Sequence, residues 1–283
     1  MLALGRLGLF KLDVCARASM QAMLAVWNDL DEAVLEEYEA WYLAEHLPER
    51  LAMAGFQVGV RVESVAVDGG AYPSPRFMTY YELASRQVLE QDAYRRALQS
   101  PSPRTRSIMP HFRNMWRAVA ELRAEGGLHC SGAWLVSVRL DADDLANWIE
   151  QMREAPPARA CRWRAYQCAH EGHGAQASPE ARFRSSPDQI PGGFLLIEHV
   201  RRSDADQTLQ QWIAPLVNAA ELRRPAQGLN VTDSARPQPT LPRVDLFLEL
   251  ARLDQRDLKV AHTPVGVEDG DIKTNEELRR AER

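Results

Sequence analysis

The sequence predicts an α+β protein built from two tandem ferredoxin-like repeats, each with the element order β-α-β-β-α-β. Its 283 residues are enough for two domains of typical size, and 45% hydrophobic with 26% charged residues is typical of a globular protein. Short segments with alternating apolar residues indicate strands, and segments with apolar residues three and four apart indicate helices. The same order of these segments occurs twice along the chain, which predicts the repeat.

The first repeat is expected over residues 20–125 and begins with a strand whose apolar side chains alternate. Asp29 and Glu32 have the spacing of a capping box and predict the start of a long helix. Pro48 should kink or restart this helix, because the residue before a proline avoids the helical conformation, and Gly55 should end it. The strands are predicted at 20–28, 56–66, 76–83 and 115–122, with a second helix at 85–98 and a Pro- and Arg-rich turn at 100–106.

The second, degenerate repeat is expected over residues 132–254, after a short linker at 125–129. Its strands are predicted at 134–140, 160–170, 194–200 and 244–250, with helices at 141–153 and 203–222. Residue identity between the halves is poor, so the repeat is inferred from element order and length. Residues 1–19 are interpreted as an N-terminal extension and residues 255–283 as a charged C-terminal tail.

A four-stranded sheet with helices on one face leaves its other face to be buried. Packing the two sheets face to face within one chain would bury the open face of each sheet. The short linker favours this packing over two independent domains. The sequence leaves a further homodimer open. The first predicted helix of the first repeat is long and rich in aromatic residues, whereas its counterpart at 141–153 is about half as long. We therefore expect the functional site in the first repeat.

Composition excludes several classes of function. A net charge of −5 provides no electrostatic reason to bind nucleic acid or an anionic membrane, and no segment is long and apolar enough to span a bilayer. The four cysteines lack the tight spacing of a disulfide framework, which favours a reducing, cytoplasmic location. They are Cys15, Cys130, Cys161 and Cys168.

No cofactor or metal is expected from the motifs. The spacing of Cys161, Cys168, His170 and His173 does not fit a zinc ribbon or finger. The sequence contains no glycine-rich phosphate loop, nucleophile elbow or His-Glu-x-x-His helix, so nucleotide, flavin and hydrolase functions have little support.

His46 is the main candidate for a functional residue. Tyr42 lies one helical turn before it and Arg50 one turn after it, so the three should share a helix face, with Tyr38 one turn further back. A helix that ends near Pro48 would leave free carbonyl groups beside His46, which favour the imidazolium form. The alternative is that Tyr42 and His46 only complete the core.

Two further groups could contribute to a site. Arg104, Arg106, His111 and Arg113 form a cluster after the second predicted helix, where guanidinium groups could hold a carboxylate or phenolate. Surface ion pairs on an exposed loop are the favoured alternative. Tyr80 and Tyr81 are neighbours on one strand, so one of them should face the helices of the first repeat.

The segment from Tyr38 to Arg50, with its Glu-His-Leu-Pro-Glu-Arg end, resembles the dimeric α/β-barrel superfamily, in particular its EthD-like and uncharacterised branches. Gly55-Phe56, Tyr81-Glu-Leu83 and the run at 100–114 add to this resemblance. It covers residues 20–123 well and residues 132–252 in outline. It implies an intrachain version of the α/β barrel. The superfamily includes cofactor-free monooxygenases, isomerases, aldol cyclases, haem enzymes and binding proteins.

These observations favour a cofactor-independent enzyme acting on a small aromatic or polyketide-like molecule. His46 would accept or donate the proton, and Tyr38, Tyr42, Arg50, Tyr80, Tyr81, Arg104, Arg106 and His111 would bind the substrate. A non-catalytic small-molecule binding or accessory protein is the alternative. Haem binding through His46 or His111 is a third.

Overall fold

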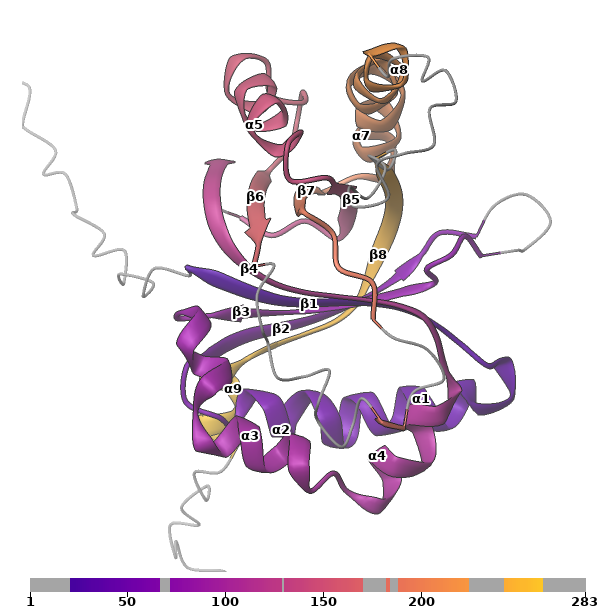
Figure 1. Cartoon of the computed structure of the whole chain (residues 1–283), viewed down its shortest axis with the longest axis vertical. Coiled ribbons are helices and arrows are strands. Elements are labelled where there is room, and N and C mark those ends of the chain that lie inside the picture. The colour runs from indigo at the N-terminus through magenta and orange to yellow at the C-terminus, as the bar shows by residue number, and fades with distance from the viewer. Residues whose placement is uncertain are drawn as a thin grey trace, which may run out of the picture.

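In a computed structural model the chain forms a closed barrel of antiparallel strands with helices on two opposite sides (Figure 1). The structure describes residues 21–66, 72–128, 130–169, 182–183, 188–223 and 242–261. Around the barrel the described strands follow the order β1-β3-β2-β8-β5-β7-β6-β4, and each neighbouring pair is antiparallel. The prediction of an α+β chain with a barrel-like core is confirmed.

The strands lie close to the predicted segments. They are β1 Ala22–Leu30, β2 Phe56–Ser64, β3 Phe77–Leu83, β4 Phe112–Gly127, β5 Trp134–Leu140, β6 Arg162–Cys168, β7 Gly193–His199 and β8 Arg243–Asp254. The pairs β4–β6 and β2–β8 join strands from the N-terminal half of the chain to strands from the C-terminal half. These two pairings close the barrel.

Helices cover each half of the barrel from outside (Figure 1). Over the first half lie α1 Leu35–Trp41, α2 Leu47–Leu51, α3 Asp92–Gln99 and α4 Pro103–Ile108; over the second lie α5 Leu145–Glu154, α7 Arg202–Gln207 and α8 Ala214–Arg223. A π-helical turn, Tyr42–His46, joins α1 to α2 into one continuous helical segment. None of the helices within the described ranges is long and apolar enough to cross a membrane.

Several local expectations differ from the structure. Asp29 does not cap the first helix, because it lies inside β1 and its carboxylate accepts the Arg76 N–H. Pro48 does not break the helix, because it lies in the first turn of α2, after the π-helical turn, where a missing N–H costs little. The segment predicted as a turn at 100–106 contains α4, with the Ser102 side chain accepting the Thr105 N–H. The expected linker at 125–129 begins inside β4, which is lengthened by its pairing with β6. Residues Gln255–Ala261 of the expected tail form helix α9, which contacts α2 and β2.

Three apolar clusters fill the molecule. One lies between the first half of the sheet and its helices, one lies between the second half and its helices, and one fills the barrel interior. Trp27 and Phe194 meet edge to face in the interior, and Phe194 stacks on Tyr166 at 5.0 Å between ring centroids. The interior is thus a packed core with large aromatic side chains.

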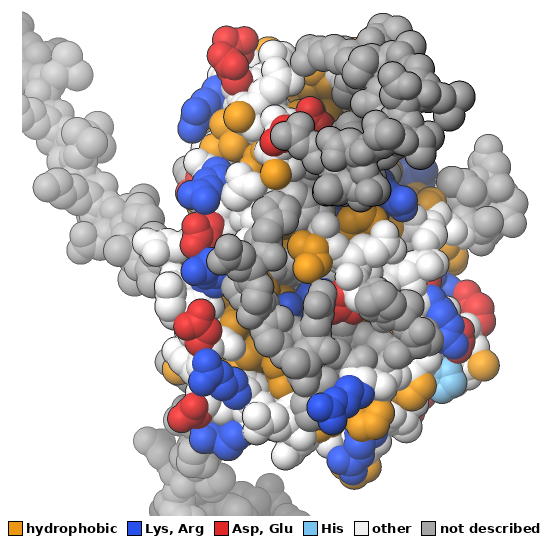
Figure 2. All heavy atoms as spheres, in the orientation of Figure 1, with side chains coloured by type: hydrophobic (Ala, Val, Ile, Leu, Met, Phe, Trp, Pro, Cys, Tyr) orange, Lys and Arg blue, Asp and Glu red, His pale blue; other side chains and the backbone are white. Residues whose placement is uncertain are grey.

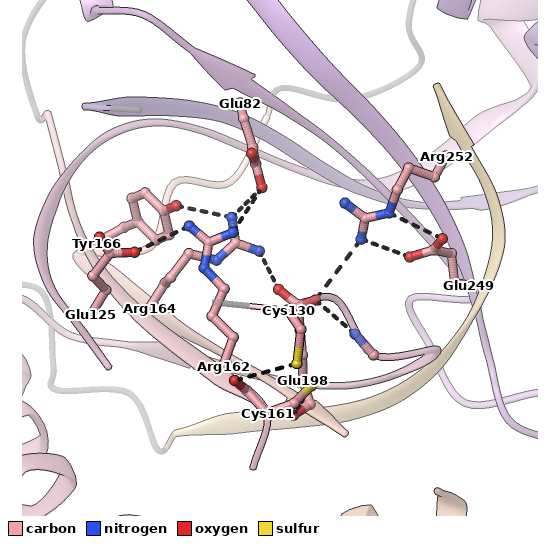
Figure 3. Close-up of polar contacts among 11 residues, drawn as sticks. Glu82, Glu125, Cys130, Cys161, Arg162, Arg164, Tyr166, Glu198, Glu249 and Arg252 are labelled. Carbon is pink, nitrogen blue, oxygen red and sulfur yellow. Dashed lines mark hydrogen bonds and ion pairs between the residues drawn. The ribbon is translucent and has the colours of Figure 1, made fainter. Parts of the chain in front are cut away.

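An ion-pair network crosses this apolar interior (Figure 3). The Arg164 guanidinium donates from Nη1 to Glu82 Oε1 at 2.5 Å and from Nη2 to Glu198 Oε1 at 2.7 Å. All three side chains are only 1–2% exposed. Burial alone would lower the pKa of Arg164, but the nearby Tyr166, Glu82 and Glu198 outweigh it and raise that pKa. Glu82 comes from β3, Arg164 from β6 and Glu198 from β7, so the network links the two halves.

The outer surface carries both signs of charge. In the view of Figure 2, acidic and basic side chains alternate along the described surface. Many charged side chains of the protein form ion pairs. Arg76 pairs with Glu32 and Glu63, and Arg252 pairs with Glu249. No large single-sign patch is visible on the described part of this face, which agrees with the modest net charge.

We expect Glu82→Gln to lower the free energy of unfolding by about 2–4 kcal/mol, because it leaves part of the buried Arg164 charge uncompensated. The control is Glu37→Gln, which removes the exposed partner of Arg104 and should change the free energy of unfolding much less, because solvent screens an exposed ion pair. Urea unfolding of both variants measures the difference. Equal costs would show that the interior pair does not hold the barrel together.

Candidate functional site

The candidate site lies between the long helical segment of the first half and the face of the sheet that this segment covers. Tyr38, Trp41 and Tyr42 are buried along this segment, at the helical spacing that turns all three toward the sheet. Tyr38 contacts Phe77 and Phe112 of the sheet with ring centroids 5.4 and 5.5 Å apart. The helix is therefore held on the sheet by aromatic packing, and its next turn carries His46.

His46 is buried against two of these rings. Its imidazole lies 4.4 Å from Trp41 and 5.1 Å from Tyr42, measured between ring centroids, and 8% of the residue is exposed. Its Nδ1 atom is fully buried and has no hydrogen-bond partner among the described residues. Burial, and then the charges of Arg50 and Arg61, lower the pKa of His46 well below its ordinary value.

This protonation state differs from the one expected from the sequence. The expected helix end, whose carbonyl groups would favour the imidazolium, does not occur, since the chain continues from the π-helical turn into α2. His46 is instead neutral at physiological pH. A neutral imidazole with an unpartnered nitrogen can either accept a proton or donate a hydrogen bond, depending on its tautomer.

Arg61 is a central part of this layer that the sequence reasoning missed. Its guanidinium carbon lies 4.4 Å from the ring centroid of Tyr38 and 4.5 Å from that of Tyr42, and the guanidinium also hydrogen-bonds Glu39. Burial would lower the pKa of Arg61, but Tyr38 and Glu39 outweigh it and raise that pKa. The sequence contains one indication of this role: Arg61 stands between Val60 and Val62 in a strand whose other residues are mostly suited to burial.

The opposite wall of the site comes from the sheet. Tyr81 lies on the helix-facing side of β3, in the same apolar cluster as Tyr42. Burial and the neighbouring Tyr42 raise the pKa of Tyr81 well above its ordinary value, and burial likewise raises the pKa of Tyr42. Both phenols therefore stay protonated and can donate hydrogen bonds to a developing negative charge.

The structure brings together five of the nine predicted site residues. Tyr38, Tyr42, His46, Arg50 and Tyr81 share the layer between helix and sheet. Arg50 is 3% exposed, with its guanidinium 5.6 Å from the ring centroid of Tyr94. Tyr80 points the other way, into the barrel interior, 5.5 Å from the Arg164 guanidinium carbon. One of the two strand neighbours thus faces the helices, as the alternation predicted.

The cluster of basic residues after the second predicted helix has surface partners. Arg104 binds Glu37 at 2.5 Å, Arg106 donates to the carbonyl of Pro101, and His111 contacts Asp31 at 3.0 Å. Arg113 also binds Asp31, at 2.6 Å. Arg104, His111 and Arg113 thus lie in ion pairs near the surface, as the alternative interpretation expects, on side chains that are partly exposed.

Of the four residues considered for a metal site, Cys161 and Cys168 lie within the described part of the chain. His170 and His173 lie outside the described residues, as does Cys15. Cys161 and Cys168 are buried free thiols, and the described residues contain no group of three metal-ligating side chains. Burial raises the pKa of both thiols to about 12, so they are not reactive thiolates at neutral pH.

Comparison with known proteins supports the fold. No family model and no curated protein matches the sequence. An anthrone oxidase-like protein of known structure is similar with a TM-score of 0.53 and 6% identity, over 84% of this chain and 94% of that one. The chain therefore has the fold of the dimeric α/β-barrel proteins.

Two further structures match less well. A monooxygenase-like protein from Listeria innocua has a TM-score of 0.36 and 8% identity, over 81% of this chain and 95% of that one. A mutant chlorite dismutase from Candidatus Nitrospira defluvii has a TM-score of 0.40 and 10% identity, over 85% and 93%. At these scores we base no argument on either protein.

The lowered pKa of His46 predicts a pH-dependent stability difference between the protein and its His46→Gln variant. The unfolded chain takes up a proton near pH 6.5, while folded His46 stays neutral, so the protein loses stability as the pH falls below about 6.5. The loss relative to the variant should reach about 1 kcal/mol at pH 5.5. Urea unfolding at pH 7.5, 6.5 and 5.5 tests this, and a constant difference would contradict it.

Proposed function

We propose that this protein is a cofactor-independent enzyme that transfers a proton on a small aromatic or polyketide-like molecule, with His46 as the base. The observation that carries the proposal is the buried Nδ1 atom of His46, which has no partner among the described residues. A buried polar atom without a partner costs about 1–3 kcal/mol, so a substrate that supplies one recovers that cost on binding.

The surroundings of His46 suit a substrate that becomes negatively charged. Burial, and then the charges of Arg50 and Arg61, lower the pKa of His46, so the two guanidinium groups place a positive potential at the imidazole. The same potential stabilises an enolate or phenolate formed when the base removes a proton. The protonated hydroxyls of Tyr42 and Tyr81 add hydrogen-bond donors from opposite walls of the layer. We propose Tyr38, Tyr42, Arg50 and Tyr81 as substrate-binding residues.

His199 provides a matched control within the same chain. It is a buried histidine whose pKa is also lowered by burial, but both of its ring nitrogens have partners. Nδ1 lies 3.3 Å from the carbonyl oxygen of Arg159 and Nε2 lies 3.1 Å from the hydroxyl of Thr208. His199 therefore has the contacts of a structural histidine, whereas Nδ1 of His46 has no partner among the described residues.

We further propose that the barrel consists of two ferredoxin-like repeats, at 20–125 and 132–254, that pack as an intrachain dimer in the EthD-like branch. Support comes from the strand orders β4-β1-β3-β2 and β8-β5-β7-β6, which are equivalent when the strands of each half are numbered in turn. A cytoplasmic location remains a prediction from the sequence, which leaves a homodimer open.

Turnover should depend on His46 and not on His199. Anthrone is a suitable first probe because its ring methylene loses a proton to give an aromatic, delocalised anion, and the anthrone oxidase-like protein has the same fold. In the absence of added metal, oxygen uptake and quinone formation should fall at least about 100-fold in His46→Gln and stay within about threefold in His199→Gln. Anthrone binding should survive in both variants, since glutamine keeps a polar group but cannot carry the proton.

The outcomes separate the alternatives. Equal losses in both variants would contradict a catalytic role for His46. Binding of phenolic or cyclic ketone ligands without turnover would favour a binding protein, and a Soret band in the purified protein would favour haem binding. Unfolding curves of both variants show whether either substitution acts through stability.

A further inference from the structure

A groove of about 520 Å³ lies at one end of the barrel, away from the residues around His46. The chain leading into β1, the turn after β3, strand β4 and the start of β6 line it, through Gln21, Ser85, Arg86, Gln87, Glu121, Leu122, Glu125 and Arg162. Its volume lies in the range of small-molecule sites. None of its lining residues belongs to the aromatic layer that holds His46.

Arg162 lines this groove with an unused hydrogen-bond donor. Its side chain is 5% exposed, and its Nη2 donates to Glu125 at 3.1 Å. Its Nη1 lies 3.7 Å from Glu82, the carboxylate that also holds Arg164 (Figure 3). The Nε atom of Arg162 is buried and has no hydrogen-bond partner among the described residues. A guanidinium in this position is both charged and able to bind one more acceptor.

Arg86 supplies a second donor of the same kind. Its Nε atom lies 4.0 Å from Glu121, beyond hydrogen-bond distance, and it too is buried with no partner in the described part of the chain. The groove is thus lined by two arginines whose Nε donors have no partner among the described residues, although such donors normally find an acceptor. A ligand oxygen would satisfy both.

The strand beside these arginines is irregular at this point. In β4 the pairing with β6 shifts register between Leu122 and Ala124, so the strand carries a bulge. Beyond it, Glu125 pairs with Arg164 in register and its side chain reaches Arg162. Bulges re-aim side chains next to binding sites. Here the Glu125 carboxylate, which follows the bulge, accepts from Nη2 of Arg162, and Nε of Arg162 has no partner among the described residues.

The charges of the groove restrict the ligand. Arg86 and Arg162 are balanced by Glu121 and Glu125, so the lining has no excess of charge. Its two charged donors match the two oxygens of one carboxylate, and the described lining holds no further cation for a second anionic group. The amide and hydroxyl groups of Gln87 and Ser85 suit hydroxyl or carbonyl substituents. We propose that this groove binds a polar monocarboxylate of the hydroxy-acid class, with its carboxylate between the Nε atoms of Arg86 and Arg162.

Calorimetric titration of the full chain with D-gluconate and L-lactate tests the proposal. At least one of the two should bind with a Kd below about 1 mM, and the corresponding neutral amide should bind at least about tenfold more weakly. Arg86→Gln should weaken binding about tenfold, because it removes one charged donor. Arg123→Gln is the matched control: Arg123 also pairs with Glu121 but does not line the groove, so affinity should not change.

The sign of the ligand charge has its own test. Glu121→Gln removes a negative charge from the groove and should tighten carboxylate binding about two- to fivefold, whereas binding of a cation would weaken. His46→Gln should bind the carboxylate normally, which separates this site from the proposed catalytic one. Saturable binding of neither acid, equal binding of acid and amide, or equal effects of Arg86→Gln and Arg123→Gln would each overturn the proposal.

Discussion

Arg164 carries a positive charge inside an apolar barrel, where the effective cost of removing an ion from water is several kcal/mol. That cost is tolerable only when carboxylates lie at hydrogen-bond distance, as Glu82 and Glu198 do. One carboxylate belongs to the first half of the chain and the other to the second. The charge is therefore satisfied only when β3, β6 and β7 hold their native register around a closed barrel. Apolar contacts among the same strands would tolerate more than one arrangement.

A filled interior determines where small molecules can bind. Large rings such as Trp27, Tyr166 and Phe194 occupy the centre of the barrel, and the Arg164 network occupies the space beside them. Outside the interior lie the packed layers between helices and sheet and the ends of the barrel. The proposed catalytic residues use the first of these, and the groove beside Arg162 uses the second.

Much of the fold follows from local patterns in the sequence. Strand β5 spans the predicted residues 134–140, and the alternation around Tyr80 and Tyr81 correctly assigns opposite faces to the two rings. The π-helical turn before Pro48 leaves no signal in residue spacing, so the continuous helical segment around it could not be predicted. The roles of Arg61 and Arg164 could not be predicted, since their partners lie 22 to 82 positions away in the sequence. Periodicity shows that a residue is buried but not which distant charge it meets.

The aromatic layer around His46 contains a feature that packing does not explain. A phenylalanine or leucine at this position would fill the space beside Trp41 and Tyr42 without an unsatisfied polar atom. His46 instead keeps Nδ1 buried and unpartnered, under a positive potential that opposes its protonation. His199 shows that this chain can satisfy both nitrogens of a buried histidine with a backbone carbonyl and a hydroxyl. The unsatisfied nitrogen is a local cost in stability, and costs of this kind concentrate where a residue is retained for what it does to a ligand.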